Sequence, residues 1–355
     1  TVYMHKATLA FKVATLSALL SSPTIWANNV TIYGLGHVSA DSVDDGQDSS
    51  SYIASNSSRL GFNGSYNISK GIDVIFQYET GVDLTAQGGN DGNGGAESSG
   101  QIFTKGRPSY VGLKGSFGTI LIGHKNGLDQ WANDYNLFAD QVGDLGNLWE
   151  GSGVPGRLDN VIYYESPKIG GGTMAVTYTP EEGQEDAAKL IVKGNYQYSK
   201  LKVGAAYASI GQGELGADDH KAIALTVGYY DDNFSLGGGL QLESDIAGIS
   251  GQDRDSYSFG GSFNVGIKGK IKAQFAVSSG DGENTDASQF AVGYDYSLND
   301  KVTLYVAYAK TDNDENVNFS VNGKGHGDKV VPLFGNDPSA FSLGIVAKFD
   351  LSFDL

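Results

Sequence analysis

The sequence predicts an all-β protein: a transmembrane antiparallel β-barrel of sixteen strands with an inward-folded third loop. Three observations carry this prediction. Residues 341–355 alternate between apolar and polar side chains, with one exception at Val346. Similar segments recur along the chain, and tight turns alternate with long polar loops between them. Successive side chains of a strand point to opposite faces, so each segment has one apolar face and one polar face.

The last strand, residues 341–355, is the clearest of these segments. A soluble β-sandwich could use such a strand too. A tilted strand needs roughly 9–11 residues to cross a bilayer, and this strand is longer. Its length, its place at the end of the chain and its apolar last residue, Leu355, favour a membrane barrel closed by this strand.

The composition agrees with a barrel. The chain of 355 residues has 51 Gly, 16 Phe, 20 Tyr, no Cys and a formal net charge of −17. After the amino terminus there is no apolar run of about 18 residues, which excludes a mature transmembrane helix. A mean hydropathy of −0.24 does not count against a barrel, because barrel strands alternate. The acidity argues against a nucleic-acid-binding function, which needs a basic surface.

The first 27 residues resemble a secretory signal sequence. Lys6 and Lys12 precede an apolar stretch at residues 13–20, and a small residue, Ala27, stands at the expected cleavage site. We expect cleavage after Ala27, which removes two lysines and takes the net charge from −17 to −19. Residues 28–355 then form a single barrel domain.

From residue 29 onward the strand candidates come in pairs. Residues 72–84 are typical: Val74, Phe76 and Tyr78 lie on one predicted face, with Gln77 and Glu79 on the other. The sixteen candidates cover residues 30–40, 57–66, 72–84, 107–115, 119–125, 160–166, 173–179, 189–198, 201–209, 221–230, 234–243, 256–265, 270–279, 288–298, 301–310 and 341–355. An even strand number with short turns at one rim and long loops at the other is typical of bacterial outer-membrane barrels.

Most acidic residues lie in the long loops, as in the segment DNDEN at residues 312–316. The simpler interpretation is a solvated rim. The alternative is that these loops hold Ca²⁺ or Mg²⁺ and bridge to lipopolysaccharide. The segment lacks the glycine and the terminal glutamate of a calcium loop.

The segment at residues 127–157 is the longest interior loop and has no strand pattern. Loops of this length in a compact domain are usually functional or disordered. Its aromatic residues, which include Trp131 and Trp149, indicate that it packs against another surface. A sixteen-stranded barrel has a wide lumen, so we expect the loop to lie against the inner wall.

Three of the four arginines stand on early strands: Arg59, Arg107 and Arg157. The alternation of its strand places Arg59 in the lumen. Arg157 opens the strand after the long loop, whereas Arg107 is ambiguous because Val111 and Leu113 obscure the alternation. Since a guanidinium stays charged at any working pH, the three together predict a basic wall facing the acidic loop.

The chain resembles the trimeric general porins of Gram-negative outer membranes. The segments that carry the resemblance are, in order, VTIYG, SSRLGFNGSY, RPSYVGLKGSFGT, GRLDNVIYYESP and the closing strand. The resemblance spans essentially the whole mature chain. It implies a homotrimer in the outer membrane, in contact with lipid and lipopolysaccharide, and a third loop that folds inward to narrow the pore.

The resemblance also implies a pore constriction with two charged sides. The basic wall would be Arg59, Arg107 and Arg157. Asp140 and Asp144 match the acids at the tip of the loop, and Asp134 is a weaker match.

Two departures from the family's pattern make this constriction less cationic. His124 stands where many members have an arginine, and Leu35 stands where some have a lumen lysine.

Opposed acids and arginines set up a transverse field, and the charge at the narrowest point sets ion preference. We therefore expect an outer-membrane porin that passes small hydrophilic solutes and ions by passive diffusion, with a weak preference for cations. A substrate-selective porin for oligosaccharides is the alternative, with Trp131 and Trp149 stacking on sugar rings. A secreted β-rich adhesin is a less favoured alternative.

An enzyme is not expected. The chain has no cysteine and no GxSxG motif, and its histidines are scattered. The segment GLGHVS resembles half of a dinucleotide fingerprint, but it lies in a strand with no helix after it. We expect neither a cofactor nor a metal.

Overall fold

The computed structural model describes residues 29–85, 106–126, 135–149, 156–214, 216–327 and 330–354, and only the main chain of Trp149. The predicted signal sequence with Ala27, and the predicted pore residues Trp131 and Asp134, lie outside this part of the chain. Within it most residues lie in strands. The strands are β1 (Asn29–Asp44), β2 (Ser49–Ser55), β3 (Arg59–Ser69), β4 (Ile72–Gly81), β5 (Ser109–Gly115), β6 (Gly118–Asn126), β7 (Arg157–Glu165), β8 (Gly172–Thr179), β9 (Lys189–Tyr198), β10 (Leu201–Ile210), β11 (His220–Tyr230), β12 (Phe234–Ser244), β13 (Arg254–Val265), β14 (Gly269–Gly280), β15 (Ala287–Ser297), β16 (Val302–Asn313) and β17 (Ser339–Phe353).

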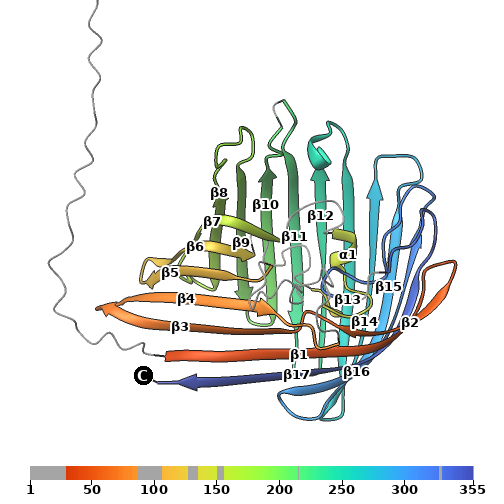
Figure 1. Ribbon diagram of the computed structural model, residues 1–355, viewed down its shortest axis with the longest axis horizontal. Helices are drawn as coiled ribbons and strands as arrows, with labels where there is room; N and C mark the ends of the chain where they lie inside the picture. The colour runs from red at the N-terminus through yellow and green to blue at the C-terminus, as the bar shows by residue number, and fades with distance from the viewer. Residues whose placement is uncertain are drawn as a thin grey trace, which may run out of the picture.

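The strands form one closed antiparallel sheet (Figure 1). From β3 to β17 each strand pairs with the next along the chain. The last strand then returns to the first: β17 pairs with β1 over fifteen residues, from Val30 opposite Phe353 to Asp44 opposite Ser339. Closure leaves no edge with unpaired main-chain groups, which is the condition for a sheet in lipid.

Seventeen strand segments make sixteen barrel strands, because β2 and β3 are two parts of one. β3 pairs with the first half of β1 and β2 with the second half. The ladder is interrupted at residues 56–58, where side chains replace it. Asn56 N and Ser58 Oγ both donate to His37 O, and His37 N donates to Ser58 Oγ. The predicted strand at residues 57–66 therefore starts within this break, and the barrel strand extends further at both ends.

The predicted apolar faces point outward. In β17 the outward side chains Phe349 and Leu351 are 48% and 59% exposed, whereas Ser342 on the inner face is fully buried. β11 alternates in the same way, with Leu225 half exposed and Ala224 buried. An apolar belt that faces away from the protein is what a barrel in a bilayer requires.

Two short helices complete the described structure, α1 (Gly146–Trp149) and η1 (Ile246–Gly248). In the described part of the chain no helix is long and apolar enough to cross a membrane. Leu145 and Leu148 pack against Ala276 and Ala287 on the inner wall, which places α1 inside the ring of strands (Figure 1).

Candidate pore constriction

The described part of the third loop, Tyr135–Trp149, packs against the inner face of β12–β16. Two side chains of β14 hold its main chain. Lys272 Nζ donates to Leu137 O at 2.9 Å, and Gln274 Nε2 donates to Gly143 O at 2.6 Å. The wall is lined there by small residues, and a Cβ added at Gly143 would lie 2.5 Å from Ala291 Cβ. The loop is therefore as close to the wall as a polypeptide can come.

The last loop, residues 314–338, holds the third loop from its other side. Gly143 N donates to Val321 O at 2.7 Å, and Val142 forms an isolated β-bridge with Asn322. Phe138, Val142 and Val321 are all fully buried in one apolar cluster. Since apolar burial of about three such side chains contributes several kcal/mol, this contact fixes the tip of the third loop.

Lys272 is the central charge of this anchor, and the sequence pattern did not single it out. It is 3% exposed, its Nζ lies 3.0 Å from Asp295 Oδ1, and it also donates to Gln141 Oε1 at 2.9 Å. The ammonium lies 4.5 Å from the centroid of the Phe138 ring, within the range of a cation–π contact. The alternation of β14 places Lys272 on the inner face, but the sequence does not show that the third loop covers it.

Asp144, one of the two predicted tip acids, is only 7% exposed. Its carboxylate accepts from Asp140 N and from Gly146 N, both at 2.8 Å, and from the Asn136 side chain. Burial, with a smaller contribution from the charge of Asp140, raises the pKa of Asp144 from 3.8 to about 7. The structure therefore places this side chain inside the loop, where it organises the tip, and not at the pore surface.

Asp140, the other predicted tip acid, is partly exposed. Its main chain has a φ of +61° and is held by the Asp144 carboxylate. Its own carboxylate lies against Gly325 of the last loop, next to Ser57, so that a Cβ at Gly325 would be 2.0 Å from Asp140 Oδ1. A side chain at position 325 would displace the Asp140 carboxylate from its present position.

The three predicted arginines gather on the facing wall. Arg107 is 4% exposed, and its Nη1 lies 3.5 Å from Glu79 Oε1. Arg59 Nε lies 3.9 Å from the other oxygen of the same carboxylate. Arg157, at the start of β7, is exposed and close enough to repel Arg107 electrostatically, whereas Asp140 attracts it. The structure thus brings the three arginines and Asp140 into one electrostatic cluster.

The position of Arg107 follows from the place where its strand begins. The prediction started this strand at residue 107, but β5 begins at Ser109. Continued alternation would put Arg107 on the same side as Val111, which is 61% exposed on the outer face. Arg107 instead lies before the strand begins, and its buried side chain contacts the carboxylate of Glu79.

Glu79 is a further functional candidate, and the sequence pattern did not single it out. It is 7% exposed between two arginines, and Tyr33 Oη donates to its Oε2 at 2.9 Å. Gln77 Nε2 in turn donates to Tyr33 Oη. Its place on the polar face of residues 72–84 was visible in the alternation, but its pairing with Arg59 of β3 and with Arg107 just before β5 was not.

Leu35 and His124, the two departures from the family's pattern, each have a charged neighbour. Leu35 lies opposite Lys348 of β17 in the strand register, so a lysine stands next to the position that lacks one. His124 Nδ1 lies 2.7 Å from Asp159 Oδ1, close to Arg157 in sequence. Lys348 therefore offsets the first departure, whereas the acid beside His124 adds no basic charge to the wall.

Comparison with known proteins identifies the family. The Gram-negative porin family matches residues 8–316. The chain belongs to this family. It is an outer-membrane protein, and members of the family are channels rather than enzymes.

Relatives are similar over most of their length. Outer membrane porin protein 32 of Delftia acidovorans is 27% identical over 87% of this chain and 92% of its own. The chitoporin of Vibrio furnissii is 27% identical over 70% of this chain and 75% of its own. The solved anion-selective porin of Comamonas acidovorans superposes with a TM-score of 0.70 at 22% identity, covering 90% of this chain and 99% of that one. These comparisons confirm the predicted barrel and place the protein in the outer membrane, which decides against a secreted adhesin.

Proposed function

We propose that this chain forms a water-filled channel through which small hydrophilic solutes and ions diffuse passively, with a weak preference for cations. One observation carries the proposal: Asp140 of the third loop and the arginine cluster of Arg59, Arg107 and Arg157 share one electrostatic site on the inside of the barrel. Fixed charges of opposite sign across a wet passage set its ion preference. No catalytic role is proposed for any residue.

The preference for cations rests on how much of the basic charge is available to the pore. Glu79 partly neutralises Arg59 and Arg107, and Arg107 is almost fully buried. The chain as a whole carries −17, and a net negative field raises the local concentration of cations. The acidic and the available basic charges at the constriction nearly balance, so the preference for cations should be weak.

We further propose that the channel is a homotrimer whose exposed apolar belt contacts lipid and lipopolysaccharide. The resemblance to trimeric porins supports this, and so does the height of the wall. β5 has seven residues and β8 has eight, fewer than the roughly 9–11 that a strand needs to cross the hydrocarbon layer. Neighbouring copies would cover this low sector.

The experiment is reconstitution of the detergent-purified protein in a planar bilayer with a KCl gradient. We expect current steps that close in thirds and a reversal potential of cation sign. Asp140→Asn should move the reversal potential toward anions, whereas Asp300→Asn, which removes an exposed acid from a short turn, should leave it nearly unchanged. Absence of conductance from folded protein would refute the channel. An anion-signed reversal would refute only the preference.

A channel selective for oligosaccharides is the second candidate. The relative that is named a chitoporin and the tryptophans Trp131 and Trp149 support it. It predicts that an oligosaccharide blocks the current saturably at micromolar concentration, which a general diffusion channel would not show.

A further inference from the structure

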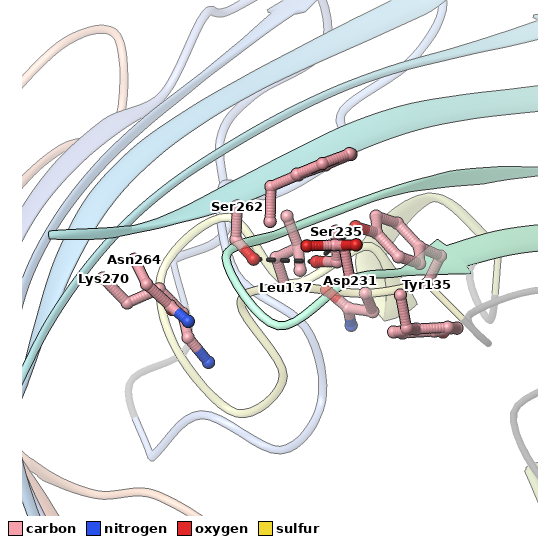
Figure 2. A pocket seen from close by; sticks show the side chains of 10 residues that line it. Tyr135, Leu137, Asp231, Ser235, Ser262, Asn264 and Lys270 are labelled. Carbon is pink, nitrogen blue, oxygen red and sulfur yellow. Dashed lines mark hydrogen bonds between the residues drawn. The ribbon is translucent and has the colours of Figure 1, made fainter. Parts of the chain in front are cut away.

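We propose that the short-turn side of the third loop carries a binding subsite for small acidic sugars. The inference rests on the proposed channel function and concerns a part of the lumen outside the arginine cluster. A pocket of about 370 Å³ lies between Tyr135–Leu137 of the third loop and the ends of β11, β12, β13 and β14 (Figure 2). This volume is near the lower end for small-molecule sites, which span roughly 300–1,000 Å³.

An aromatic platform forms one side of the pocket. Tyr230 is 43% exposed, and its ring lies over Gly228, where a Cβ would be 2.7 Å from the ring. Tyr135 is buried behind it, with ring centroids 6.0 Å apart and planes at 54°. Since tyrosine loses little conformational entropy on binding and offers an apolar face, such a ring suits the apolar face of a sugar.

Hydrogen-bonding groups on the opposite side are held in place by their neighbours. Tyr135 Oη donates to Ser235 Oγ at 2.8 Å, and Ser235 Oγ lies 2.7 Å from Ser262 Oγ (Figure 2). Asn264 Nδ2 donates to Asp232 O at 2.8 Å, which leaves its Oδ1 free to accept. Convergent hydroxyl and amide groups beside an aromatic ring are the usual composition of a site for a hydroxylated ligand.

The charge of the pocket selects an acidic ligand. Lys270 points toward the pocket beside Asn264 (Figure 2). It lies opposite Asp295 in the strand register, but Asp295 is already paired with Lys272 at 3.0 Å, and the two ammonium groups repel each other. The carboxylate of Asp231 is paired with Lys200. One positive charge therefore remains, and a carboxylate on the ligand would neutralise it.

The position of the pocket makes binding measurable. Its lining residues Asp231 and Lys270 lie beside short turns, and short turns face the periplasm in bacterial barrels. One wall of the pocket is the third loop itself, so a bound solute would lie at the exit of the constriction and reduce the current. A solute added on the short-turn side would reach it without crossing the constriction.

The test is current block of single channels by D-glucuronate, with D-glucose as the neutral control of similar size, added to each side in turn. We expect saturable block by glucuronate, stronger from the short-turn side and weaker with glucose. Lys270→Gln should raise the half-blocking concentration of glucuronate roughly fivefold, as expected for one ion pair in contact with water, and should leave glucose unchanged. Tyr230→Ala should weaken block by both sugars. Lys268→Gln removes a lysine from the adjacent turn and should change neither.

Equal block by both sugars in the unsubstituted channel, or an equal effect of Lys268→Gln and Lys270→Gln, would overturn the proposal while the channel function stands. Absence of conductance would refute the channel function alone. In that case calorimetry of glucuronate with the detergent-purified barrel decides the subsite: binding that Lys270→Gln weakens supports it, and no binding overturns it.

Discussion

Two regions on the inside of this barrel use charged residues for opposite purposes. On the wall of β3–β7, Arg59 and Arg157 are in contact with water. At the wall of β12–β16, Lys272 is buried and holds the third loop, and Asp144 is buried inside that loop. A charge exposed to the pore acts on passing ions through the field that it sets up. A buried charge must instead be fully paired, and it then acts on structure. Residue type alone does not distinguish the two.

The anchor should be the more sensitive region. Lys272→Met removes the hydrogen bonds to Leu137 and Gln141 and leaves Asp295 without its partner. Loss of one member of a buried pair costs about 3 kcal/mol or more. We expect a lower melting temperature and noisier, larger single-channel currents as the third loop leaves the wall. Lys268→Met, in the adjacent turn and exposed, is the matched control and should alter neither quantity. Wild-type conductance and stability in Lys272→Met would contradict the role of the anchor.

The second largest effect is expected where the third loop approaches the wall most closely, at Gly143. Gly143→Ala would introduce both a backbone strain at a φ of +86° and an overlap with Ala291. Overpacking and a left-handed residue together cost roughly 1–4 kcal/mol. Gly71→Ala separates the two effects, because Gly71 also has a positive φ of +77° but has nothing within 4 Å. We expect Gly143→Ala to destabilise the protein more than Gly71→Ala in thermal unfolding and to change conductance. Equal destabilisation by the two substitutions would show that the third loop does not contact the wall at Gly143.

Asp144 predicts a pH dependence of the tip of the third loop. Its pKa in the folded protein, about 7, lies above its ordinary value of 3.8, so the folded loop binds a proton that the open loop releases. The loop is therefore most stable at low pH and loses stability as the pH rises toward and through 7. Opening of the tip should increase about tenfold between pH 6 and pH 8. Hydrogen exchange at the Asp140 and Gly146 amides, corrected for the intrinsic exchange rates, measures this opening. Asp144→Asn has no proton to release and should remove the dependence; persistence in this variant would assign it to another group.

The barrel could be predicted from the sequence, but the different roles of the charged residues inside it could not. Alternation identifies each strand because lipid imposes one apolar face, and closure follows from the length of β1 and β17. Alternation also places Arg59 and Glu79 in the lumen. It cannot reveal that Glu79 lies between Arg59 and Arg107, since that depends on register across the sheet. Nor can it separate Asp144 from Asp140, because burial of a loop acid is decided by tertiary contacts.

The smallest effect is expected at the arginine wall, and it distinguishes the two regions most directly. Glu79→Gln keeps the shape of the side chain and removes the negative charge between Arg59 and Arg107. Because a unit charge at 4 Å in water is worth about 1 kcal/mol, the ratio of cation to anion permeability should fall by up to about fivefold. The reversal potential in a KCl gradient reports this change. Glu165→Gln is the matched control: Glu165 also lies on the inner side of the barrel and accepts a bond from Tyr163 Oη, but it is at the far end of β7 from Arg157. If both variants shift the reversal potential equally, the effect is one of net charge. If only Glu79→Gln shifts it, the arginine wall sets the ion preference of the pore.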